Sequence, residues 1–312
     1  MARVRHAGNQ KEFVLRPTHV FGRNSEHAHM ILQHARSSRV HATITWNGKV
    51  WYVRDLSTNG TYINGKRLPK NEDALLYAGD VIGFSGQDVE AIIILDVSAP
   101  KPMLVSHHHH SKVIELEELT CLPNEQNPIV TLRATANGDW LYESLDHTQM
   151  LTPGDILTLG GEHWVFVAAK TNTDMTATEA SSRLNEQYQL QFTASQNEEH
   201  IRLSIQHNDQ CIDLGERTHH YLLFLLAKQR INDADNFIQT SEQGWLDKDL
   251  LCKDLGVAEE HLNILIFRFR KQINAIKHAP SLLKDIVQRR RREIRLNCED
   301  IKISGGTQTL IP

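Results

Sequence analysis

Turns built on asparagine and glycine recur between short β-rich runs in the first hundred residues, and they constrain the fold more than any other feature. Only Asn47-Gly48 separates the runs His41–Trp46 and Lys49–Val53. This dipeptide adopts the positive φ values of a two-residue turn, so the sequence predicts a hairpin. Further turn signals follow at Asn59-Gly60, Asn64-Gly65 and Ala78-Gly79-Asp80. Short strands at this spacing predict a β-sandwich of about 100 residues.

The predicted turns carry polar side chains of one chemical kind. Loops at one end of a sandwich can bring such side chains together. Two guanidiniums, two hydroxyls and a carboxamide offer positive charge and hydrogen bonds, which suit a dianionic phosphoryl group. They include no nucleophile or general base, so we expect recognition and no enzymatic activity. The residues are Arg23, Ser38, Arg39, Thr58 and Asn59.

At these positions the sequence closely resembles the forkhead-associated (FHA) domain, over about residues 1–98. The matching motifs are Gly22-Arg23, Ser38-Arg39-Val40-His41, Asp55-Leu56-Ser57-Thr58-Asn59-Gly60-Thr61 and Asn64-Gly65. The resemblance implies a phosphothreonine-binding β-sandwich. It implies that Arg23 and Ser38 grip the phosphate, that Arg39 and Thr58 assist, and that Asn59 bonds the peptide backbone. It also implies that His41 braces the loop. The alternative is a sandwich of ordinary turn residues that no longer binds.

A shorter copy of this pattern follows. Leu76–Gly86 and Leu151–Gly161 share Leu-x-x-Gly-Asp and an apolar strand at a constant offset of 75 residues. The second copy lacks about 14 residues that correspond to the Asn-Gly loops, and it has none of the phosphate motifs. We therefore interpret residues 113–170 as a degenerate, structural FHA-like β-domain.

Two polar segments, residues 99–112 and 171–186, are predicted linkers. The first contains His107–His110, for which we favour a solvated linker over metal binding because no carboxylate or cysteine lies nearby. The four cysteines are too far apart for a Cys-x-x-Cys pair, so we expect reduced thiols and no metal or cofactor.

The net charge of −4 hides a strong partition. Residues 1–100 carry +3, residues 101–215 carry −10, and residues 216–312 carry +3. Within the last part, residues 261–297 hold ten Lys and Arg against two acids. Such a cluster is typical of a polyanion-binding face.

The C-terminal part predicts three helices, at Glu216–Arg230, Asp247–Asp254 and Ala258–Lys277. The last has one apolar stripe and an opposite polar face, and the order of a short helix, a turn and a longer basic helix is typical of a helix-turn-helix. A predicted hairpin at Asp285–Leu296 carries four arginines. The expected DNA contacts are Asn263, Phe267, Arg268, Arg270, Lys271, Asn274, Arg289, Arg290, Arg291 and Arg292.

Residues 187–304 are similar to the winged-helix effector domain of two-component response regulators. The similarity lies in Asn263–Ile273, which matches the recognition helix, and in the strands within Gln187–Leu214. The chain departs from that family where Arg291 and Glu293 replace glycines of the wing turn. Phe267 is expected to meet a thymine methyl or a protein partner.

The sequence thus predicts a multidomain β plus α+β protein: an FHA sandwich, a degenerate FHA-like domain and a winged helix. We expect a cytoplasmic transcription regulator without a membrane span, which couples a Ser/Thr kinase to duplex DNA by reading phosphothreonine. Its ligand is another protein or its own linker, where Thr171 and Thr176 have acids three positions on, and phosphorylation there would close the molecule or join two copies. The alternative is a phospho-dependent adaptor whose winged helix binds protein, with the acidic middle segment shielding the basic face.

Overall fold

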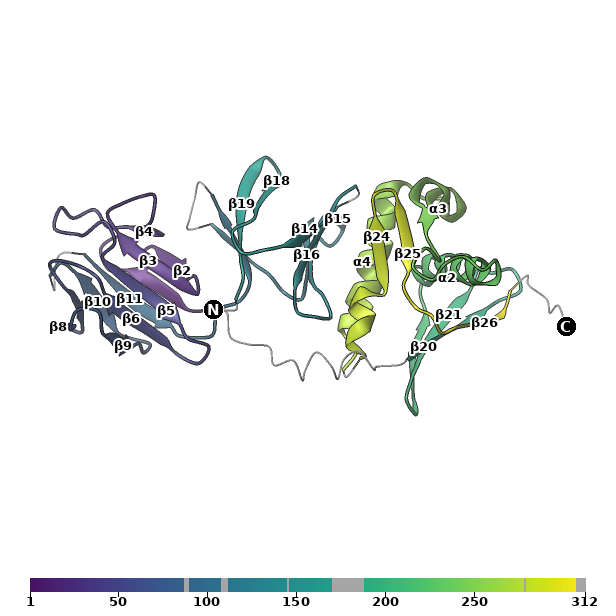
Figure 1. Ribbon diagram of the computed structural model, residues 1–312, viewed down its shortest axis with the longest axis horizontal. Coiled ribbons are helices and arrows are strands. Elements are labelled where there is room, and N and C mark those ends of the chain that lie inside the picture. The colour runs from purple at the N-terminus through teal and green to yellow at the C-terminus, as the bar shows by residue number, and fades with distance from the viewer. Residues whose placement is uncertain (87–89, 108–111, 145, 170–187, 278, 307–312) are drawn as a thin grey trace. The chain divides into compact units, whose positions relative to one another are not determined.

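The computed structural model of the protein describes residues 1–86, 90–107, 112–144, 146–169, 188–277 and 279–306. The chain divides into two compact units, and each combines two stretches of chain. The first unit contains Met1–Leu116 and Thr152–Asp174, and the second contains Glu117–Leu151 and Met175–Pro312. Figure 1 labels their strands and helices. No helix within the described ranges is long and apolar enough to cross a membrane.

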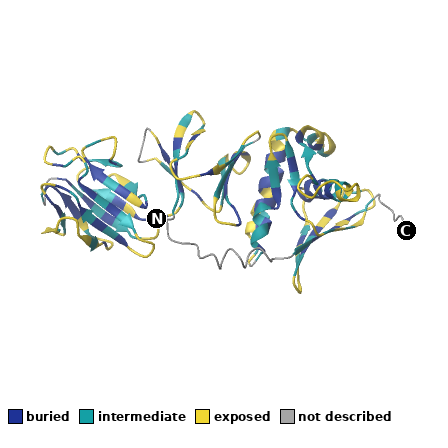
Figure 2. Cartoon of the chain, viewed as in Figure 1, coloured by how far each residue is buried: buried dark blue, intermediate teal, exposed yellow. Residues whose placement is uncertain are grey.

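A β-sandwich forms the N-terminal part of the first unit, as the sequence predicts. One sheet has the order β2-β1-β11-β10-β7-β8, and the other has the order β4-β3-β5-β6-β9. Alternate residues of both sheets share one core that includes Phe21, Ile44 and Ile82 (Figure 2). The first sheet contains β1 Arg3–His6, β2 Glu12–Val14, β7 Thr61–Ile63, β8 Lys66–Arg67, β10 Val81–Phe84 and β11 Glu90–Asp96. The second contains β3 Thr18–Gly22, β4 Met30–Ile31, β5 Ala42–Trp46, β6 Trp51–Asp55 and β9 Asp73–Leu75.

The hairpin predicted at Asn47-Gly48 is confirmed. Strands β5 and β6 pair antiparallel out to Trp46 and Trp51. Gly48 has a φ of 96°, and the Asn47 side chain accepts a hydrogen bond from the amide of Val50 at 2.9 Å. The turn therefore forms from local chemistry.

Two four-stranded sheets follow. The sheet β13-β12-β19-β18 lies in the first unit, and the sheet β14-β15-β16-β17 lies in the second. Their strands are β12 Met103–Ser106, β13 Val113–Glu115, β14 Leu119–Asn124, β15 Asn127–Ala134, β16 Trp140–Glu143, β17 Thr148–Leu151, β18 Ile156–Leu159 and β19 Glu162–Val167. The strand orders repeat β2-β1-β11-β10 and β3-β5-β6-β9 of the N-terminal sandwich. In the described part of the repeat, β4, β7 and β8 have no counterpart.

The internal repeat also keeps the same turn. In the first copy Asp80 accepts from the amide of Tyr77 at 2.8 Å, and in the second Asp155 accepts from the amide of Thr152 at 2.8 Å. The division between the two units nevertheless runs through the segment 113–170, for which the sequence predicts a single domain. The physical reason is that β14 and β15 pack on a helix of the second unit.

The remaining strands and helices of the second unit share one apolar core. A sheet of order β22-β21-β20-β26 carries the helices, and β26 pairs parallel with β20, which the sequence did not indicate. Its strands are β20 Tyr188–Ala194, β21 Ile201–His207, β22 Gln210–Glu216 and β26 Ile301–Gly305. The helices are α2 His220–Asp235, α3 Lys248–Leu255, α4 Glu259–Asn274 and the 3-10 helix η1 Ser281–Asp285. The small sheet β23-β25-β24 contains β23 Leu246–Asp247, β24 Val287–Arg290 and β25 Glu293–Leu296.

Helices α3 and α4 lie within the predicted ranges to a few residues. Asp247 accepts from the amides of Asp249 and Leu250 at the start of α3, and Gly256 ends it with a φ of 64°. A left-handed backbone conformation favours glycine, and at Gly256 it turns the chain directly into α4. Strands β24 and β25 are joined by only Arg291-Arg292, and Arg291 has a φ of 27°. The hairpin therefore turns tightly without the glycines of the response-regulator wing.

Candidate functional site

Three loops at one end of the N-terminal sandwich are joined by hydrogen bonds of their backbones. The first loop is residues 23–29, the second is residues 32–41 and the third is residues 56–60. Gly22 ends β3, and a Cβ there would lie 2.1 Å from the carbonyl oxygen of Arg39, so only glycine permits this approach. As a result the amide of Arg23 donates to the carbonyl of Ser38 at 2.9 Å, and the amide of Asn24 donates to that of Arg39 at 3.2 Å. The guanidinium-bearing Arg23 is thereby fixed beside Ser38.

His41 joins the second loop to the third. Its ring is fully buried, its Nδ1 accepts from the amide of Ser38 at 3.1 Å, and its Nε2 donates to the carbonyl of Gly60 at 3.2 Å. Burial lowers the pKa of His41, which favours the neutral tautomer that these two bonds require. The Ser38 hydroxyl in turn accepts from the amide of Thr58 at 3.1 Å. His41 therefore contacts two loop backbones, in the bracing position that the resemblance implies.

A buried carboxylate, that of Asp55, fixes the third loop. Asp55 accepts from the amide of Ser57 at 3.0 Å and from the hydroxyl of Thr61 at 2.8 Å. Above it, the side-chain amide of Asn59 donates to the carbonyl of Arg36 at 2.7 Å, back to the second loop. Because all three loops share these bonds, their backbones are held in place before any ligand arrives.

The side chains that face solvent here carry uncompensated positive charge. Arg23, Arg39, Thr58 and Asn59 are exposed, and Ser38 is half-buried. No ion pair within the described residues involves Arg23 or Arg39, whereas Arg54 of the same sandwich pairs with Asp73 at 2.7 Å. Two free guanidiniums beside hydroxyl and amide donors have the charge and hydrogen-bonding groups that suit an anion. The structure thus brings the five predicted residues to one end of the sandwich.

The predicted DNA contacts on α4 have a different environment. Arg268 and Asn274 are exposed, and the exposed Lys271 pairs with Glu125 at 2.5 Å. By contrast Asn263 and Phe267, which the sequence places opposite the apolar stripe, are buried, and so is Arg270, which it places beside that face. Strands β14 and β15 pack on this helix and cover that face.

The hairpin arginines are also largely engaged within the second unit. Arg289 donates to the side chain of Asn263 at 2.8 Å and to the carbonyl of Ser144 at 3.1 Å. Arg290 pairs with Glu242 and Glu293, and Arg292 pairs with Asp249. Arg291 is exposed at the tip, and no ion pair of it occurs among the described residues.

Some predicted features lie outside the described residues, namely Thr171, Thr176 and His108–His110. Among the residues that are described, no group of three metal-ligating side chains occurs. The structure adds two residues that sequence reasoning missed, Glu143 and Arg133. Both are buried, and they pair with each other at 3.4 Å. Only the opposite charges of the middle and C-terminal segments hinted at such a contact.

Comparison with known proteins bears on the first site. Residues 19–85 match the family described as the FHA domain. Among solved structures, the chain is similar to the FhaA FHA domain complexed with the intracellular domain of Rv3910, at 30 % identity over 30 % of this chain and 99 % of that chain, with a TM-score of 0.27. It is also similar to the N-terminal FHA domain of S. cerevisiae Rad53p with a phosphothreonine peptide, at 26 % identity over 31 % and 93 %, with a TM-score of 0.28. No curated protein matches the chain.

Proposed function

Given that residues 19–85 form an FHA domain, we propose that this chain binds phosphothreonine segments there and duplex DNA through its C-terminal part, as a phosphorylation-dependent transcription regulator. The observation that carries the first half is the pair of unpartnered, exposed guanidiniums on braced loops. Arg23 and Arg39 supply fork-shaped donors for a phosphoryl group, and the Ser38 and Thr58 hydroxyls supply neutral ones. Asn59 would then bond the peptide backbone.

The test is a titration of the full chain with one peptide in its phosphothreonine and unmodified forms. Arg23→Ala removes charge-assisted hydrogen bonds to the phosphate, each worth about 1.5–3 kcal/mol, so affinity for the phosphopeptide should fall about 10- to 100-fold. Arg54→Ala is the matched control, because it removes an exposed arginine whose charge is already paired with Asp73. If wild type binds both peptides equally, the phosphothreonine half of the proposal is wrong.

The C-terminal half is proposed as a winged helix. Helix α3, the turn at Gly256 and helix α4 are arranged in sequence as a helix-turn-helix, and β24–β25 follow as a candidate wing. The exposed cations Arg268 and Arg291 are available for phosphates, which position such domains on a duplex. We propose that docking of a phosphopeptide on the FHA domain supplies the signal.

One observation favours the alternative, an adaptor whose winged helix binds protein. The outer face of α4 already packs on a polypeptide, because Phe267 and Arg270 are buried there. A salt series separates the two functions. For each phosphate neutralised, the logarithm of DNA affinity falls by about 0.9 per logarithmic unit of salt. Weak binding that is insensitive to salt would favour the adaptor.

A further inference from the structure

Helix α4 is buried on two sides that differ in chemistry. One side contributes Leu262, Ile266 and Phe269 to the apolar core of the second unit. The other side carries Asn263, Phe267 and Arg270, which are only 6 %, 4 % and 5 % exposed although they lie outside that core cluster. An arginine and an asparagine on an outward face are normally solvated, so another element must cover them.

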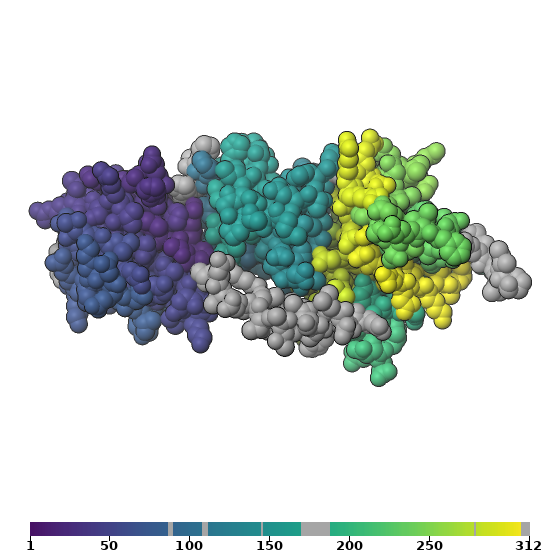
Figure 3. All heavy atoms as spheres, in the orientation of Figure 1, coloured from purple at the N-terminus to yellow at the C-terminus, as the bar shows by residue number. Residues whose placement is uncertain are grey.

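That element is the sheet β14–β17, which we name the covering sheet. Its strands β14 and β15 pack on α4, and Figure 3 shows these teal atoms against the yellow C-terminal segment. The stretch that contains it, Glu117–Leu151, holds six acidic residues against one basic residue. The covering sheet is therefore an acidic surface placed on a basic one.

Carboxylates of the covering sheet and its turns meet the cations one by one. Glu143 pairs with Arg270, and its Oε1 accepts from Arg270 Nη2 at 3.0 Å. The remaining pairs are Glu125 with Lys271 at 2.5 Å, Asp146 with Lys248 at 2.8 Å, and Glu118 with Lys284 at 2.8 Å. Two of these cations, Arg270 and Lys271, are expected DNA contacts, which would bind phosphates or bases of a duplex.

Glu143 is the centre of this contact. It is 2 % exposed and lies between Arg270 and Arg133, and Arg133 also pairs with Asp285 at 2.5 Å. Burial alone would raise the pKa of Glu143, but Arg270, Arg133 and Arg289 together lower it to about 2. The carboxylate is therefore ionised. Removing its charge would leave the buried guanidinium of Arg270 without a counter-ion, whereas Arg133 would keep Asp285.

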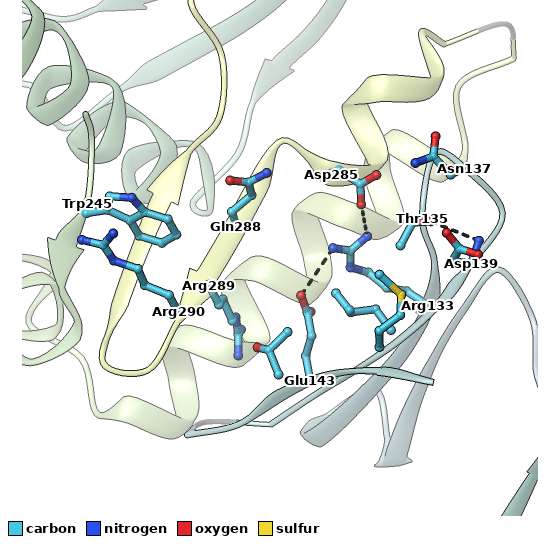
Figure 4. A pocket seen from close by; sticks show the side chains of 13 residues that line it. Arg133, Thr135, Asn137, Asp139, Glu143, Trp245, Asp285, Gln288, Arg289 and Arg290 are labelled. Carbon is cyan, nitrogen blue, oxygen red and sulfur yellow. Dashed lines mark hydrogen bonds and ion pairs between the residues drawn. The ribbon is translucent and has the colours of Figure 1, made fainter. Parts of the chain in front are cut away.

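The seam between the covering sheet and the hairpin is also incompletely packed. A cleft of about 450 Å³ opens along it, with Arg133, Glu143, Asp285, Arg289 and Trp245 among its lining residues (Figure 4). The cleft is open to solvent, so the seam is not sealed along its length as a protein core is. Contacts between domains that move relative to one another are polar in this way, whereas a permanent core is apolar.

We propose that the covering sheet is a built-in acidic lid that occupies the DNA face of α4 in place of phosphates and has to lift before a duplex binds. This inference rests on the proposed DNA-binding function. Both ends of the covering sheet continue directly into strands of the first unit, because β14 follows β13 and β17 precedes β18 in the chain. A change in the first unit therefore has two covalent routes to the lid.

Cys121 provides a native reporter of lid opening. It lies in β14 and is half-buried. Burial and the Glu125 charge raise the pKa of its thiol, while Lys271 of α4 acts in the opposite direction. Opening would expose this thiol and speed its alkylation, which peptide mass spectrometry can follow residue by residue. The exposed Cys211 serves as an internal reference.

The test compares Glu143→Gln with wild type in the full chain, using Cys121 alkylation and binding to a random-sequence duplex over a salt series. We expect both the alkylation rate and the DNA affinity to rise about tenfold or more, because the buried pair is broken. Glu118→Gln is the matched control, since it removes one exposed carboxylate from the same seam, and it should change either quantity less than about twofold. Should Glu143→Gln misfold, Asp146→Lys with Glu118→Lys repels the lid without a buried defect.

The outcomes separate the lid from the function beneath it. If both lid variants leave alkylation and DNA affinity at wild-type values, the lid is wrong. If Cys121 becomes reactive while DNA affinity stays at a measurable wild-type value, the covering sheet does not compete with DNA and the lid is again wrong. If Cys121 becomes reactive and no variant binds the duplex even at low salt, the lid opens as proposed and the DNA-binding function is overturned.

Discussion

The two ring hydrogen bonds of His41 allow a direct test of how the loops that carry Ser38 and Thr58 are fixed. His41→Phe keeps the volume and the planarity of the buried ring, which stacks edge-on against Phe84 at 5.7 Å, but it removes both ring nitrogens. The amide of Ser38 and the carbonyl of Gly60 then lose their partners. The ring would still pack on Phe84, but the backbones at Ser38 and Gly60 would separate.

The expected magnitude follows from those two bonds. Each buried polar group left without a partner costs about 1–3 kcal/mol, so losing two partners in His41→Phe should lower the free energy of unfolding of the sandwich by about 2–6 kcal/mol. For a domain of this size, 1 kcal/mol corresponds to about 4–8 °C, so its Tm should fall by at least about 8 °C. Phosphopeptide affinity should also fall, because Ser38 and Thr58 are no longer preorganised.

Calorimetry of the full chain and fluorescence anisotropy with a phosphothreonine peptide measure both effects. His41→Gln is the control, because its amide retains one donor and one acceptor, and its loss should be smaller. The pH dependence adds a check. Burial lowers the pKa of His41 below its unfolded value, so the unfolded state binds more protons and stability is lost as pH falls below about 6.5. A His41→Phe protein as stable and as tightly binding as wild type would refute the bracing role.

Two further predictions concern the second unit. Burial lowers the pKa of His219 to about 4, so the stability of this unit should decline by on the order of 2–3 kcal/mol as pH falls from about 6.5 to 4. The midpoint of urea unfolding, measured against pH, should follow this decline, and His219→Gln should flatten the profile. A wild-type profile that is already flat would contradict the assignment. Gly256 has a φ of 64° and no neighbouring atoms within 4 Å of an added Cβ, so Gly256→Ala should cost about 1 kcal/mol through backbone strain alone. In urea unfolding, Gly256→Asn should cost less than Gly256→Ala, and the reverse order would rule out strain as the cause.

Much of the candidate phosphate site could be predicted from the order of the residues. The motifs from Gly22 to Thr61 placed the five ligand candidates in turns, and the turns do converge. The Asn47-Gly48 hairpin and the stop at Gly256 were equally accessible, because positive φ is a property of one or two residues. The surroundings of the outer face of α4 were not. A stripe pattern identifies which side of α4 faces the core, but it says nothing about what covers the other side.

The amino-acid sequence by itself determined the turns, the approximate limits of α3 and α4, the repeated Leu-x-x-Gly-Asp strand pattern and the chemistry of the loops that carry Arg23, Ser38 and Thr58. Each of these depends on residues close together in the chain. For α2 the predicted range Glu216–Arg230 differs from the observed His220–Asp235 by four to five residues. Only the tertiary structure decided that Glu143 is buried between Arg270 and Arg133, that β26 joins β20, and that the middle segment contributes a sheet to each unit. These depend on two surfaces over a hundred residues apart matching in shape and charge, and no local preference encodes that match.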